Sequence, residues 1–247
     1  MERITGIATF LETIMEAVLD KPVKKTTYCR SRADEFFATF PTEKISAYKE
    51  HWKSIQPQNH GDIFRRYLFS FMSVHTSWKG NVRGYEAIKN YDEWLDDKEL
   101  LRDKLKNSGV GLYNNRTKYL WAFKDQFWSN PKDYYLTAKK YHIKKRDSIV
   151  NKINGLGLAK CAFTLEMIHP LECRAVCLDV HILRLYGMDH LTYGSNKGYN
   201  LYRKAEQHWS VNCGKIGVPS AIARAIYWDD IQNKPDSSYW TYVFNAA

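Results

Sequence analysis

Residues 153–185 read INGLGLAKCAFTLEMIHPLECRAVCLDVHILRL, and this stretch decides the fold of the chain. It joins a glycine-rich turn, Gly155-Leu156-Gly157, to an apolar run with helical spacing and then to Asp179, which precedes a second apolar helix pattern. Glycine adopts positive φ and lets a ligand approach the backbone closely. The N–H groups that open the following helix attract anions. The pattern therefore predicts a turn between two helices that grips a phosphate through its backbone.

Asp179 stands where the N-cap of a helix belongs, because residues 180–185 have helical apolar spacing and the pattern stops at Gly187. The positive end of a helix favours a negative charge at this position. The neighbouring residues 176–178 and 180 are apolar, so they remove water and strengthen the attraction of the carboxylate to nearby positive charge. A plain helix cap explains Asp179 equally well when that residue is considered alone.

The combination of turn and aspartate resembles the helix-hairpin-helix DNA glycosylases, the superfamily of endonuclease III. In that family a hairpin of the form L-P-G-V-G is followed by a helix and a V-D-x-H segment with the essential aspartate. Residues 153–157 match the hairpin with Asn154 in place of the usual proline, and residues 178–181 match the aspartate segment. Weaker similarity at residues 69–76 and 110–118 extends the resemblance over residues 60 to 190.

The resemblance implies a DNA N-glycosylase that excises a damaged or modified base. An enzyme that acts on a base flips the nucleotide out of the duplex. Asp179 is then expected to stabilise the oxocarbenium-like charge that develops on the sugar. Two alternatives remain open: a DNA base-modifying transferase on the same fold, of the kind that hypermodifies thymine in phage DNA, and a DNA-binding module without catalysis.

The family divides at the second residue after the last hairpin glycine, where members with lysine form a Schiff base and cut the strand. Ala159 occupies this position, which predicts a monofunctional enzyme that uses water as the nucleophile. Lys160 lies 19 residues before Asp179 and reaches the lysine position if the hairpin shifts by one residue. Adjacent helix residues point about 100° apart, so an unshifted Lys160 contacts phosphate or solvent. A bifunctional glycosylase and AP lyase that uses Lys160 remains the alternative.

The predicted DNA contacts come from two segments. The hairpin supplies its backbone and one lysine: Asn154, Gly155, Leu156, Gly157, Leu158 and Lys160. The segment 75–83 is expected to be a polar loop that approaches the gap left by the flipped nucleotide, with these candidates: His75, Ser77, Trp78, Lys79 and Asn81. Trp78 is a candidate wedge or base platform, against ordinary packing.

Three further side chains near the predicted site receive structural roles. His181 is expected to fix the loop geometry rather than act as a base. Glu166 is expected at the surface because its helix continues past it, and Trp228 is expected in the core of a C-terminal packing helix.

Composition favours a polyanionic partner, because 37 Lys and Arg against 27 Asp and Glu give a net charge of +10. We expect a monomer that binds double-stranded DNA. Five cysteines, an odd number, make a disulfide scaffold improbable and indicate a reducing compartment. No iron–sulfur cysteine pattern is present, so we expect no cofactor, although a monovalent or divalent cation at the hairpin is compatible with the sequence. Without a signal peptide or membrane span, the expected location is intracellular, in the cytoplasm at the nucleoid.

Hydrophobic periodicity predicts an all-α fold of two helical lobes with the active cleft between them. Residues 60–166 are expected to form the central lobe, which ends in the helix-hairpin-helix, and residues 1–59 plus 167–247 the other lobe. The predicted helices cover residues 6–19, 33–40, 63–74, 98–106, 116–127, 147–153, 159–168, 180–185, 199–209 and 219–228.

Overall fold

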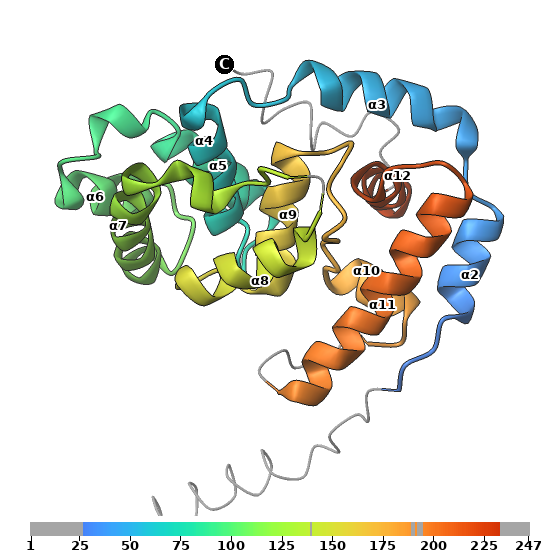
Figure 1. The fold of residues 1–247 in the computed structure, drawn as a ribbon. Coiled ribbons are helices and arrows are strands. Elements are labelled where there is room, and N and C mark those ends of the chain that lie inside the picture. The colour runs from blue at the N-terminus through green and yellow to red at the C-terminus, as the bar shows by residue number, and fades with distance from the viewer. Residues whose placement is uncertain (1–26, 139, 189–190, 192–194, 233–247) are drawn as a thin grey trace, which may run out of the picture.

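The computed structural model describes residues 27–138, 140–188, 191 and 195–232. All regular elements in these ranges are helices, which confirms the all-α class (Figure 1). The helix predicted at residues 6–19 lies outside them. The α-helices are α2 (Ser31–Ala38), α3 (Ile45–Ser54), α4 (His60–Met72), α5 (Trp78–Ile88), α6 (Lys98–Asn107), α7 (Tyr113–Ser129), α8 (His142–Lys152), α9 (Leu158–Ile168), α10 (Val180–Leu185), α11 (Asn196–Lys215) and α12 (Ser220–Gln232). Short 3-10 helices cover Thr42–Lys44, Tyr91–Glu93 and Pro131–Tyr134.

Two helices of the described chain were not predicted from the sequence, α3 and α5. The prediction of a polar loop over residues 75–83 is wrong beyond Ser77, because α5 begins at Trp78. The Ser77 side chain caps this helix by accepting a hydrogen bond from Gly80 N at 3.2 Å. Trp78 packs edge-on against Phe69 of α4, with ring centroids 5.7 Å apart. Tertiary packing thus stabilises a segment whose own polarity favours a loop.

The helices form two groups (Figure 1). In one group α4 packs on α5, α7 and α9, while α6 packs on α7 and α8 on α9. In the other group α12 packs on α3 and α11, and α2 packs on α10 and α11. The lobe boundary expected at residue 166 falls inside α9, and the division into lobes remains a prediction.

Large aromatic side chains fill the interior of both groups. Phe64 of α4 stacks on Phe123 of α7, with centroids 5.8 Å apart, and both are buried. On the other side Phe36 stacks on Trp209 at 5.6 Å, which joins α2 to α11. The high aromatic content therefore serves the core at these positions. None of the helices in the described part of the chain has the length and apolar character of a membrane span.

Polar contacts anchor α12 on α3 as well as apolar packing. The hydroxyl of Tyr48 donates a hydrogen bond to the buried carboxylate of Asp229. Lys44, just before α3, forms an ion pair with Asp230 at 2.8 Å. Because these acidic residues follow Trp228 directly, the contacts fix the part of α12 that bears this tryptophan.

His169, which follows α9, gives the fold a dependence on pH. Its Nε2 accepts a hydrogen bond from Leu136 N at 3.1 Å. Burial, with a smaller effect of His142, lowers the pKa of His169 to about 4. Between pH 6.5 and 4 the unfolded chain therefore binds a proton that the folded chain does not, so stability falls as the pH falls through this window.

We predict that the free energy of unfolding of the wild type, measured relative to that of His169→Gln, falls by about 2 kcal/mol between pH 7 and pH 4.5. The change is smaller than for a fully buried ring, because His169 is partly exposed. Urea unfolding at several pH values measures the difference. His60→Gln, a change at an exposed histidine, is the matched control. A difference independent of pH would contradict the prediction.

Candidate active site

Asp179 is the N-cap of α10, as the sequence predicts. Its Oδ1 atom accepts hydrogen bonds from His181 N at 2.9 Å and Ile182 N at 3.0 Å. These N–H groups have no partner within a helix. One carboxylate oxygen of Asp179 is therefore held by the backbone of the helix that it caps. Val180 beside it is an exposed apolar residue, so an apolar surface borders the carboxylate.

The connection 173–178 leads from α9 to this aspartate without helical structure, and most of it is buried. Buried backbone N–H groups need partners, and side chains of α11 supply two of them. Glu206 accepts from Val176 N at 2.8 Å. The hydroxyl of Tyr202 accepts from Leu178 N at 3.1 Å and donates to Val176 O at 2.6 Å. These contacts hold the backbone of the connection in one conformation up to Asp179.

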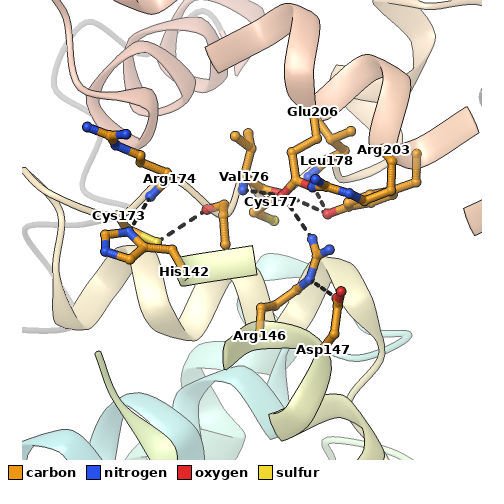
Figure 2. A network of polar contacts seen from close by, with 12 residues as sticks. His142, Arg146, Asp147, Cys173, Arg174, Val176, Cys177, Leu178, Arg203 and Glu206 are labelled. Atoms are coloured by element: carbon orange, nitrogen blue, oxygen red, sulfur yellow. Dashed lines mark hydrogen bonds and ion pairs between the residues drawn. The ribbon is translucent and has the colours of Figure 1, made fainter. Parts of the chain in front are cut away.

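Buried charge surrounds Glu206 (Figure 2). Arg146 of α8 is fully buried and forms an ion pair from Nη1 to Glu206 Oε1 at 2.9 Å. Arg203 pairs with the other carboxylate oxygen. Burial raises the pKa of Glu206, and Arg146 opposes this shift. In Figure 2 Val176, Cys177 and Leu178 lie beside Glu206, and Arg146 reaches the same carboxylate from α8, so one carboxylate ties α8 and α11 to the connection.

Glu166, on α9, also binds a backbone N–H group of the connection. The prediction that Glu166 lies at the surface is wrong, since only 1% of the residue is exposed. Its Oε1 atom accepts from Cys177 N at 2.9 Å, and its Oε2 atom pairs with Arg224 Nε at 2.5 Å. Arg224 lies on α12 and is 2% exposed. The buried position of Glu166 could not be predicted from the sequence, because its partners come from segments distant along the chain.

Trp228, expected in the core, is half-buried and contacts the aspartate. Its Nε1 donates a hydrogen bond to Asp179 Oδ2 at 2.8 Å. The ring of His181 packs edge-on against the indole, with centroids 5.4 Å apart. The expectation of pure packing is therefore wrong for Trp228, while the packed ring of His181 agrees with a structural role. Both carboxylate oxygens of Asp179 accept a defined donor.

Lys160 lies in the first turn of α9, and its side chain is half-buried. Its Nζ lies 5.7 Å from the ring centroid of Phe163, and the guanidinium of Arg224 lies 4.9 Å from that same ring. The two cationic side chains thus pack on one aromatic ring, and the direction of Lys160 relative to Asp179 remains a prediction.

The hairpin explains why glycine stands at residue 155. Gly155 has φ +93, and a Cβ atom there would come within 2.5 Å of the Tyr119 ring. Gly157 has extended backbone as the N-cap of α9, and a Cβ atom there would meet open space. The start of α9 is thus open to a ligand, as the phosphate grip requires, and phosphate binding remains a prediction.

The other hairpin residues divide by exposure. Asn154 is exposed, whereas the side chains of Leu156 and Leu158 are buried, 3% and 8% exposed. These leucines can offer a ligand their backbone but not their side chains. They anchor the turn instead.

The second predicted contact segment is brought toward the same region through aromatic packing. His75 and Lys79 are exposed, while Asn81 is buried, 3% exposed, and faces no solvent. Phe69, on which Trp78 packs, also meets Phe163, with centroids 6.1 Å apart. The start of α5 is therefore linked through Phe69 to Phe163, the ring on which Lys160 and Arg224 pack.

Leu112 is a candidate contact that we did not select from the sequence. It is 53% exposed and has φ +49, a strained value for leucine. His75 is also exposed and has φ +47. The buried Arg116 joins these two tips, because it donates to Gly111 O at 3.0 Å and to Val74 O at 2.7 Å. In the sequence, only the position of this apolar residue directly after Gly111 pointed to an exposed tip.

In the ranges that the structure describes, no three His, Cys, Asp or Glu side chains gather so as to hold a metal ion. The five cysteines are free thiols, four of them buried. Burial raises the pKa of Cys161 and of Cys177 to about 12 each. These thiols act as packing groups rather than nucleophiles.

Comparison with known proteins agrees with this geometry. The family model described as 8-oxoguanine DNA glycosylase matches residues 41–218. The 8-oxoguanine DNA glycosylase/AP lyase of Sulfolobus acidocaldarius is 26% identical over 121 residues, which cover 49% of this chain and 58% of that protein. The match thus spans little more than half of the relative.

Solved structures share the fold. The 8-oxoguanine DNA glycosylase of Thermotoga maritima has a TM-score of 0.63 at 16% identity and covers 82% of this chain and 97% of its own. That of Methanocaldococcus jannaschii has a TM-score of 0.60 at 18% identity, with 81% and 92% covered. The glycosylase/lyase of the same archaeon, in complex with a 15mer DNA containing 8-oxoguanine, has a TM-score of 0.60 at 17% identity, with 82% and 96% covered.

We predict that Glu166→Gln lowers the free energy of unfolding by about 3 kcal/mol, because glutamine keeps the acceptor for Cys177 N but removes the carboxylate beside the buried Arg224. Urea denaturation measures the loss. In the double variant with Arg224→Met the loss should be smaller than the sum of the two single losses. Glu172→Gln, at an exposed residue directly before the connection, serves as the control. Additive losses would contradict the coupling.

Proposed function

Because this chain belongs to the 8-oxoguanine DNA glycosylase family, we propose that it is a DNA glycosylase that excises a damaged or modified base from double-stranded DNA. The proposal rests on the fixed carboxylate of Asp179 at the start of α10 and on a hairpin whose last glycine leaves the start of α9 open to a ligand. The names of the relatives make 8-oxoguanine the first base to test. The net charge of +10 supports binding to DNA.

Asp179 acts on the sugar of a flipped nucleotide. As the bond between C1′ and the base breaks, positive charge develops on the ring oxygen and C1′, and a fixed anion beside them lowers the barrier. The donors on both carboxylate oxygens hold that anion in place before the substrate arrives. The expected gain comes from this fixed orientation.

In the form of the proposal that the name of the Sulfolobus relative supports, Lys160 supplies the nucleophile. Its neutral amine attacks C1′, and the base leaves with the electron pair of the N-glycosidic bond. Loss of an amine proton and opening of the sugar give a Schiff base between Nζ and C1′. Loss of a C2′ proton then expels the 3′ phosphate and cuts the strand. The support is the name of the Sulfolobus relative, glycosylase/AP lyase, and the position of Lys160 in the first turn of α9, directly after the hairpin.

A monofunctional enzyme, favoured by Ala159 in the sequence, differs in one respect. Water instead of Lys160 attacks C1′, so the product is an intact abasic strand. The two chemistries thus give different products in one assay.

We predict that duplexes with 8-oxoguanine are cut without alkali, that borohydride traps a covalent complex with DNA, and that Lys160→Gln abolishes the trap. Asp179→Asn should lower base release at least 100-fold while DNA binding stays within about threefold. Lys106→Gln, at an exposed lysine of α6, is the control.

Breaks that appear only after hot alkali would contradict the role of Lys160 and establish the monofunctional enzyme. Absence of abasic sites with 8-oxoguanine and with a panel of damaged and modified bases would contradict glycosylase activity and favour base modification or simple binding. Full activity of Asp179→Asn would contradict both forms of the proposal.

Leu112 and His75 fit the duplex side of the site. Proteins that unstack bases insert apolar side chains between them, and Leu112 is an exposed apolar tip held rigid by Arg116. We therefore include Leu112 among the proposed DNA contacts, beside the hairpin and His75.

We predict that Leu112→Gly raises the free energy of unfolding by up to about 1 kcal/mol, because glycine relieves the strain of φ +49, and lowers base release about tenfold. Tyr141→Gly is the matched control, since Tyr141 is 69% exposed with φ +65 at the far end of α8 from the hairpin. Thermal unfolding and single-turnover assays measure both effects. Equal activity of Leu112→Gly and wild type would contradict the contact.

A further inference from the structure

We propose that the indole N–H of Trp228 positions the Asp179 carboxylate for the reaction, an inference that rests on the glycosylase function proposed above. The Nε1 atom donates to Oδ2 at 2.8 Å, whereas both backbone donors bind Oδ1. The terminal torsion of an aspartate is broad, so bonds to Oδ1 alone leave the carboxylate plane free to turn. The bond from Trp228 fixes that plane.

The count of lone pairs shows which atom is left for the substrate. Each carboxylate oxygen accepts about two hydrogen bonds. Oδ1 of Asp179 accepts two from the backbone, and Oδ2 accepts one from Trp228. Oδ2 therefore keeps a free position for the developing charge on the sugar, and Trp228 sets the direction of that position.

Trp228 can serve as a rigid support because α12 is anchored on both sides of it. One turn before it, Arg224 pairs with Glu166, whose other oxygen accepts from Cys177 N two residues ahead of the aspartate. Directly after it, Asp229 accepts from Tyr48 of α3. The indole and the carboxylate are thus held by one closed set of contacts.

A packing role alone does not need the N–H group. An aromatic ring without the N–H group could keep the edge-on contact with His181, but it cannot donate to a carboxylate. A hydrogen bond to an ionised group is shorter and stronger than a neutral one, and this one ends on the anion proposed to act on the sugar. The N–H group is therefore the part of Trp228 to test.

Replacement of Trp228 by benzothienylalanine keeps the fused ring and exchanges the N–H group for sulfur. With saturating enzyme and a duplex containing 8-oxoguanine, we expect the single-turnover rate of base release to fall about tenfold, the loss of one oriented hydrogen bond. The Kd for the duplex should not change, and the melting temperature should fall by no more than about 5 °C, the effect of one lost hydrogen bond. Trp228→Phe should reproduce the loss of rate, and Trp128→Phe, at an exposed tryptophan of α7, should have no effect.

A second readout does not depend on activity. The indole N–H signal of Trp228 in the NMR spectrum of the uniformly ¹⁵N-labelled protein should move on Asp179→Asn and stay in place on Glu172→Gln, if Trp228 donates to Asp179 in solution.

The outcomes separate the inference from the function on which it rests. An unchanged rate with benzothienylalanine, or an indole signal that ignores Asp179→Asn, overturns the positioning role while the glycosylase function stands. A raised Kd with an unchanged rate at saturation overturns it in favour of a binding contact. No base release by the wild type from any duplex overturns the function itself, and the indole signal then reports only on the free protein.

Discussion

The structure depends on two buried carboxylates that hold the backbone of the connection 173–178. Glu206 and Glu166 accept from consecutive N–H groups of this connection, and each is paired with a buried arginine. A connection without helix or strand cannot satisfy its own N–H groups in the interior. The carboxylates do so from α11 and α9, and their arginines come from α8 and α12. Four helices thereby fix the position of the next residue, Asp179, which caps α10.

Such pairs contribute less to stability than to a unique arrangement. Removing two charges from water costs nearly as much as their attraction returns, so an apolar core of the same volume could be equally stable. An apolar pair could not bind an N–H group of an irregular connection, however. We infer that Arg146 and Arg224 are present because the two glutamates must stay charged while buried. The tryptophan on Asp179 extends the same principle into the site, where a neutral donor orients an anion without cancelling its charge.

Local signals predicted part of this site. The apolar spacing after Asp179 and the glycine at residue 187 mark α10 and its cap, and Gly155 marks the one hairpin position where positive φ and the Tyr119 ring exclude a side chain. Glu166, Trp228 and α5 were missed for one reason. Their state is decided by partners far along the chain, and their own neighbourhood argues for a surface residue, a core residue and a loop.

In the proposed reaction the fixed carboxylate of Asp179 faces the sugar of a flipped nucleotide while the hairpin holds the phosphate. A crystal structure of Asp179→Asn bound to a duplex with 8-oxoguanine would reveal this arrangement. We expect C1′ of the flipped nucleotide within about 4 Å of the side chain at residue 179, with a phosphate on the backbone at the start of α9. A damaged nucleotide that stays stacked in the duplex, or a sugar bound away from residue 179, would contradict it.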